Sequence, residues 1–82
     1  MFRILTEEKN VDKIKAMLVG LGLDFTLFTG HGTWKGQEEN SVAVELDNIT
    51  REEAEHAART IKRMNSQESV LLQEIPIVSD LI

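Results

Sequence analysis

The sequence predicts an α+β domain in which two helices and four strands share one apolar core. Two segments place apolar residues at helical spacing, and four short segments alternate apolar and polar residues. Residues that favour turns separate several of these segments. With 82 residues, the chain has room for a single domain. The elements are expected in the order β-α-β-β-α-β.

The first half of the chain is expected to form a strand, a helix and a second strand. Residues 2–6 and 23–29 alternate in polarity, as half-buried strands do. Between them, apolar residues at helical spacing predict a helix over 11–21. Asn10 is a suitable N-cap for this helix, and Gly22 suits the left-handed conformation that ends many helices.

The second half is expected to contain two more strands around a second helix. Residues 39–46 predict the third strand, and residues 69–75 predict the fourth. A helix is expected over 51–65, because Thr50 and Glu53 stand at the spacing of a capping box. Small alanines on its apolar side would let this helix approach a sheet closely.

This order of elements is that of the ferredoxin-like βαββαβ plait, a four-stranded antiparallel sheet with both helices on one face. Right-handed crossovers predict the strand order 4-1-3-2. Residues 1–76 are expected to form the domain. Residues 77–82 are an apolar tail, which either contacts another subunit or folds over its own sheet edge.

Composition argues against several classes of protein. The chain has no cysteine, which excludes disulfides and thiolate metal ligands. Its formal net charge of −5 argues against general nucleic-acid binding, because phosphate contacts need clustered Lys and Arg. No apolar run is long enough to cross a membrane or to form a signal peptide. A soluble, cytoplasmic protein is therefore expected.

The sequence contains no recognisable catalytic or metal-binding set. The two histidines, His31 and His56, belong to separate parts of the expected fold. No serine, histidine and acid form the pattern of a hydrolase triad. An enzyme is the least supported class, with His31 as its one candidate residue, and no cofactor or metal is expected.

The most distinctive stretch is residues 29–36, a glycine-punctuated segment that is expected to form an exposed loop. His31, Trp34 and Lys35 in this loop could stack on a ring and neutralise an anion. Alternatively, the segment is a hairpin in which Trp34 folds back onto the sheet edge while Lys35 points into solvent.

In the expected topology this loop lies at the same end of the plait as the turn at residues 65–68. The two lie on opposite sides of the sheet, so they would meet more readily across an oligomer than within one subunit. A small anionic, nucleotide-like ligand is expected at this end. The expected ligand-binding residues are His31, Trp34, Lys35, Arg59, Arg63, Asn65 and Gln67.

The sheet face opposite the helices is expected to be more apolar than a solvated face normally is. The residues that indicate this include Phe28 and Ala43. The excess apolar surface predicts a homo-oligomer, either a dimer or a trimer. Docking on a different protein is the alternative explanation.

With these elements placed, the chain resembles the small trimeric proteins of the nitrogen-regulatory PII and CutA type. The resemblance concerns topology and length, and it covers nearly the whole chain. It implies an oligomer with ligand sites between subunits, below a loop that joins the second and third strands. The loop at residues 29–36 is shorter than a PII effector loop, and no nucleotide-binding motif of that group matches.

A second resemblance rests on Gly-x-Trp-Lys-Gly-x-Glu-Glu at residues 32–39, Arg-x-x-Lys at 59–62 and Asn-x-Gln-x-x-Val-Leu at 65–71. These motifs are similar to small uncharacterised proteins of phages and bacteria. Analogy with small phage proteins that sequester signalling nucleotides implies a non-catalytic, oligomeric binding protein. The alternative is an acidic interaction module or inhibitor, phage-encoded by the same analogy, that docks by its apolar sheet face.

Overall fold

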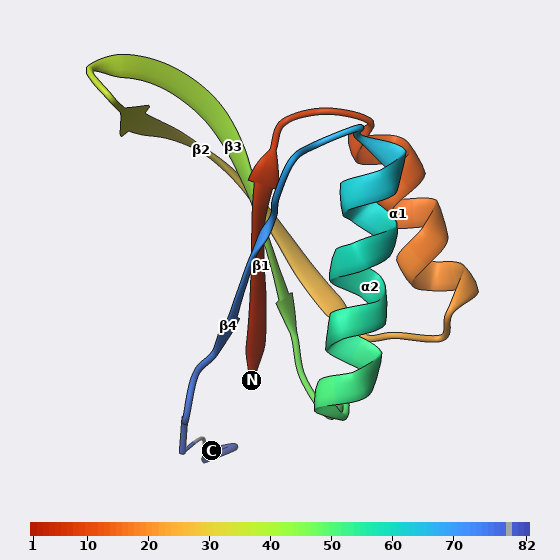
Figure 1. Cartoon of the computed structure of the whole chain (residues 1–82). Helices are drawn as coiled ribbons and strands as arrows, with labels where there is room; N and C mark the ends of the chain where they lie inside the picture. Colours follow the sequence, from red (N-terminus) through yellow and green to blue (C-terminus); the bar gives the residue numbers. More distant parts are fainter. Residues whose placement is uncertain (79) are drawn as a thin grey trace.

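The computed structural model describes residues 1–78 and 80–82, apart from the side chain of Trp34. It is an α+β fold with the expected order of elements (Figure 1). The elements are β1 (Phe2–Glu7), α1 (Val11–Gly20), β2 (Phe25–Trp34), β3 (Gln37–Leu46), α2 (Arg51–Met64) and β4 (Leu71–Glu74). The helices and strands expected from the sequence are therefore all present in the described part of the chain.

The four strands form one antiparallel sheet in the order β2-β3-β1-β4. Read from β4 towards β2, this is the order 4-1-3-2 that the crossover rule predicts. Both helices lie against the same face of the sheet (Figure 1). The opposite face carries no helix among the described residues and is called the open face below.

The core lies between the sheet and the two helices. Along β1, Phe2 and Ile4 are buried, whereas Arg3 and Leu5 alternate with them and belong to the open face. The fully buried apolar residues are Ile4, Ile14, Leu18, Val42, Val44, Leu46, Ala54, Ala57 and Ile61. They come from both helices and the two central strands, so a single core supports both layers.

The segment 29–36 is not the loop that its glycines suggest. β2 continues to Trp34, β3 begins at Gln37, and these two residues pair across the hairpin. Lys35 and Gly36 form the turn, with φ of 51° and 77°. Two successive residues with positive φ are typical of a two-residue hairpin turn whose twist matches that of the strands. The expected exposed loop is therefore wrong and the alternative of a hairpin is confirmed, because a tight turn needs only these two residues.

The hairpin extends past the other strands. Glu7, the last residue of β1, pairs with Ser41, and residues 31–40 pair only with one another within the sheet. They form a two-stranded ribbon that projects beyond the sheet and curves over (Figure 1). We call residues 31–40 the ribbon.

Asn10 precedes α1 as expected, but its side chain does not cap that helix. Its backbone is left-handed, with φ of 55°, and its Nδ2 donates to the Met64 carbonyl oxygen at 3.2 Å and to Asn65 Oδ1 at 3.0 Å. Asn10 therefore ties the start of α1 to the end of α2. The capping box of Thr50 and Glu53 at the start of α2 is confirmed.

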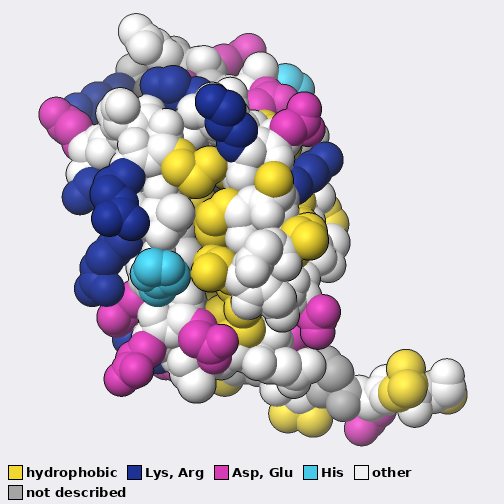
Figure 2. Space-filling model, turned by 90° about the vertical axis from the view of Figure 1, so that its right-hand side faces the viewer, with side chains coloured by type: hydrophobic (Ala, Val, Ile, Leu, Met, Phe, Trp, Pro, Cys, Tyr) yellow, Lys and Arg dark blue, Asp and Glu magenta, His cyan; other side chains and the backbone are white. Residues whose placement is uncertain are grey.

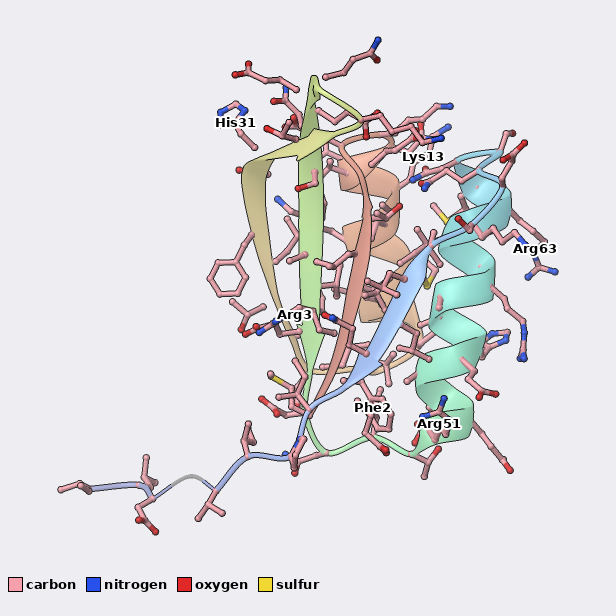
Figure 3. All side chains as sticks on the ribbon, turned by 60° about the vertical axis from the view of Figure 1, so that its left-hand side comes forward. Phe2, Arg3, Lys13, His31, Arg51 and Arg63 are labelled. Atoms are coloured by element: carbon pink, nitrogen blue, oxygen red, sulfur yellow. The ribbon has the colours of Figure 1, made fainter. Side chains whose placement is uncertain are left out.

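After β4 the chain continues as an extended tail (Figure 3). Ile75 exchanges two hydrogen bonds with Met1: its N–H donates to the Met1 carbonyl at 2.8 Å, and its carbonyl accepts from the terminal amine at 3.1 Å. Ser79 lies outside the described residues. The exposed apolar side chains of the tail are Ile77, Val78, Leu81 and Ile82. Val78, Leu81 and Ile82 are almost wholly exposed, and contact of this tail with another subunit or with its own sheet edge stays a prediction.

Candidate functional site

A hollow of about 750 Å³ lies where the ribbon meets the end of β1 and the turn between α2 and β4. Lys35 and Gln67, both expected in a binding site, line it together. These residues therefore meet within one chain, although the sequence suggested that they would meet more readily between subunits. We call this space the ribbon hollow. Its volume is in the range of small-molecule binding sites.

Charge in the ribbon hollow is mainly negative. Glu7 comes from β1, Glu39 from the ribbon and Glu68 from the α2–β4 turn, whereas Lys35 is the one cationic side chain among the described residues that line the hollow. Three carboxylates against one ammonium attract cations, because clefts lined by one sign of charge concentrate the field. The arrangement therefore opposes the anionic ligand that was expected beside Lys35.

The remaining lining of the ribbon hollow is apolar at one side and hydrogen-bonding elsewhere. Leu5, Val70 and Leu71 supply apolar surface. Hydroxyl and amide groups come from residues such as Ser41 and Asn40. A few polar groups beside an apolar surface can orient a bound ligand. This lining therefore suits binding without catalysis.

A buried polar network supports the turn that forms one wall of this hollow. Asn65 is fully buried, and its Nδ2 donates to Gln67 Oε1 at 2.8 Å and to Thr6 Oγ1 at 3.4 Å. Thr6 Oγ1 in turn donates to Gln67 Oε1, and Gln67 Nε2 donates to the Ser69 carbonyl at 3.1 Å. The Asn65 side chain is thus engaged inside the protein. Its expected contact with a ligand is replaced by a supporting role.

The other predicted residues of the 29–36 segment do not join this wall. His31 is exposed on β2 opposite Asn40 (Figure 3) and is not among the residues that line the ribbon hollow. The side chain of Trp34 lies outside the described residues, so its expected stacking role stays a prediction. Of the three predicted residues in this segment, Lys35 is the one that the structure places at the ribbon hollow.

Arg59 and Arg63 belong to a second, shallower hollow of about 350 Å³, which we call the α2 hollow. Lys62 lines it too, and Ser66 and Gln67 line both this hollow and the ribbon hollow, so the two hollows are neighbours. Figure 2 shows Lys and Arg side chains gathered along one edge of the helical face. The described residues that line this second hollow include no carboxylate, so its charge suits an anionic group.

Ion pairs leave part of this positive charge available. Glu55 pairs with Arg51 at 3.1 Å and with Arg59 at 3.5 Å. Lys62 and Arg63 form no ion pair among the described residues. They stand in the last turn of α2, where cations also stabilise the helix dipole.

The three acidic residues at the ribbon hollow, Glu7, Glu39 and Glu68, were not among the predicted site residues. Adjacent acids such as Glu38 and Glu39 diverge along a strand, so they suggested solubility rather than a shared site. The extension of β3 into the ribbon places Glu39 at the hollow that Glu7 and Glu68 also line. The sequence signal for that extension is weak: Gly36 suits a positive φ, but Lys35 is not one of the residues (Asn, Asp or Gly) that usually precede glycine in a two-residue turn.

The described residues hold no group of His, Cys, Asp or Glu side chains that could bind a metal ion. In the same part of the chain, no helix is long and apolar enough to cross a membrane. Neither the protein-family models nor the curated proteins compared with this chain give a match.

Proposed function

We propose that this protein is a non-catalytic binding module of ferredoxin-like topology, with its ligand in the ribbon hollow. One observation carries the proposal. Segments from the start, middle and end of the chain converge on a single hollow and bring Glu7, Glu39 and Glu68 to it. The sheet and the Asn65 network hold two of its walls, so such a site would be largely preformed.

The charge of the hollow favours a ligand with an ammonium or guanidinium group. Guanidinium groups pair well with carboxylates because their planar donors can form two parallel hydrogen bonds. Lys35, at the ribbon turn, would then donate to a carbonyl oxygen of the same ligand. A molecule that combines a cationic group with a carbonyl group fits both sets of partners.

Argininamide is a suitable probe because it carries both kinds of group. We expect it to bind the wild-type protein, and replacement of Glu39→Gln to weaken binding by about tenfold, the effect of losing one charge-assisted hydrogen bond. The variant Glu38→Gln is the matched control, since it removes the same charge from the neighbouring residue, which does not line the hollow. Titration calorimetry at low ionic strength measures both affinities. Equal affinities for the two variants would contradict the proposal.

A second candidate function is favoured by the α2 hollow, where an anionic group would meet Lys62 and Arg63. This proposal keeps the anionic, nucleotide-like ligand and moves it away from Lys35. The observation that favours it is that the described lining of the α2 hollow holds three cationic side chains, Arg59, Lys62 and Arg63, and no carboxylate.

Pyrophosphate is the probe for this second candidate. We expect Arg63→Gln to weaken its binding by about fivefold, because a cation on a salt-screened surface contributes about 1 kcal/mol. Arg51→Gln is the control, since Arg51 lies on the same helix but outside the hollow. Calorimetry at about 20 mM and about 200 mM salt checks the result, because the higher ionic strength screens exposed charges more strongly. Equal binding by the two variants would exclude the α2 hollow as an anion site.

A further inference from the structure

One row of apolar side chains crosses the open face of the sheet. Leu71 of β4 pairs with Leu5 of β1, Leu5 pairs with Ala43 of β3, and Ala43 pairs with Phe28 of β2. Each strand therefore contributes one apolar residue at the same level. With strands about 4.8 Å apart, the row is about 14 Å long. We call these four residues the apolar row.

The apolar row is open to solvent at both ends. Phe28 is 50% exposed and Leu71 is 52% exposed. The next row along the strands is polar: Arg3 pairs there with Glu45 through a 2.7 Å ion pair. A solvated sheet face is expected to be polar throughout. The apolar row is therefore a local feature that a binding partner would explain.

The apolar row is continuous with the ribbon hollow. Leu5 and Leu71 belong to the row and also line the hollow. Glu7 follows Leu5 by two residues on β1, so both lie on the open face. Glu39 and Glu68 stand around the same hollow. Together the row and the hollow form an apolar stripe with carboxylates along one side.

We propose that this combined surface binds a polypeptide segment of a partner protein that carries apolar side chains next to Lys or Arg. The inference rests on the proposed function, because the basic side chain of the partner is the cationic group in the ribbon hollow. The apolar side chains of the segment lie on the row. Lys35 donates to a backbone carbonyl of the segment.

Charge complementarity selects this occupant over two others. A second copy of the chain would bring a net charge of −5 towards the three carboxylates. The tail, residues 75–82, contains Asp80 and neither Lys nor Arg, so a tail would supply apolar contacts without a cation. An apolar and basic segment satisfies both halves of the surface.

The size of the row sets the length of the segment. An extended chain advances about 3.3 Å per residue, so about five residues span the row and place two or three side chains on it. One or two flanking residues would reach the ribbon hollow. At this advance per residue, a peptide of about eight residues is long enough to span both the row and the hollow. A random library of displayed peptides of this length is therefore suitable for the test.

The test selects peptides from this library on the immobilised full chain and measures their affinities by fluorescence anisotropy. We expect the enriched peptides to combine apolar residues with Lys or Arg. Phe28→Thr should lower the affinity for these peptides at least tenfold. Glu39→Gln should also lower the affinity and should reduce its salt dependence. The controls are Val19→Thr, which removes an apolar residue that is 67% exposed on α1, and Glu38→Gln. Both controls should bind like the wild type.

Different failures point to different conclusions. One outcome is that argininamide depends on Glu39 while Phe28→Thr leaves the affinity for the peptides unchanged. In that case the row is not part of the site, so the inference is wrong and the proposed function stands. If neither ligand depends on Glu39, both fail. Enrichment of acidic peptides, or no enrichment, also overturns the inference. If the wild-type protein has the mass of an oligomer in solution and Phe28→Thr has the mass of one chain, a second copy covers the row and the inference is wrong.

Discussion

Replacing Asn65→Ala is expected to lower the free energy of unfolding by about 2–3 kcal/mol, because it leaves buried hydrogen-bonding groups without partners. Asn65 is fully buried and joins Asn10, Thr6 and Gln67. Without it, the side chains of Asn10 and Gln67 lose a partner each. The turn that forms one wall of the ribbon hollow loses its anchor at the same time.

Urea denaturation followed by circular dichroism measures this change. Asn40→Ala is the matched control: Asn40 is exposed on the ribbon, and we expect its replacement to change the free energy of unfolding by less than about 0.5 kcal/mol. If both replacements have the same small effect, the buried network does not support the turn.

The second large effect is expected from Leu18→Ala, which should lower the free energy of unfolding by about 3 kcal/mol. Leu18 is fully buried in α1 and belongs to the core between the helices and the sheet. Its truncation removes apolar contacts and leaves a cavity that the neighbouring side chains fill only in part. This variant therefore tests whether α1 packs on the sheet.

Val19 supplies the comparison for Leu18. It is the next residue of α1, and it is 67% exposed. We expect Val19→Ala to leave the stability within about 0.5 kcal/mol of the wild type. Thermal and urea unfolding of the two variants give the difference. Equal destabilisation would mean that α1 presents another side to the sheet.

The fold was largely predictable because its signals are local and agree with one another. Alternation in residues 2–6 and 39–46 located two strands, and the capping box at Thr50 located the start of α2. The crossover rule then left one strand order. The strand boundaries were predicted less well: β2 is Phe25–Trp34 where 23–29 was expected, β3 begins two residues earlier than expected, and β4 begins two residues later.

The ribbon could not be read correctly from composition alone. Three glycines in residues 29–36 suggested a loop, but Gly30 and Gly32 lie in β2, and Gly36 alone of the three has positive φ. A glycine count does not show which glycine the backbone requires. The register of the two ribbon strands depends on the position of the turn, and the turn is formed by Lys35 and Gly36.

The positions of the predicted site residues agree with the structure in part, whereas their ligand-binding roles stay predictions. Lys35 and Gln67 were placed correctly at one end of the fold, and Arg59 and Arg63 lie together at the α2 hollow. Asn65 was predicted at this end too, but the sequence does not distinguish a buried amide from one that faces a ligand. The dimer or trimer and the resemblance to the PII and CutA type stay predictions.

The central claim is that the ribbon, the end of β1 and the α2–β4 turn form one binding site. The most direct measurement is a titration of the ¹⁵N-labelled protein with argininamide, followed through the backbone amide shifts. We predict that the largest shifts fall together on residues 35–41 and 66–71, with smaller ones at Glu7. Shifts confined to one of these segments, or spread evenly over the acidic residues of the surface, would contradict the claim.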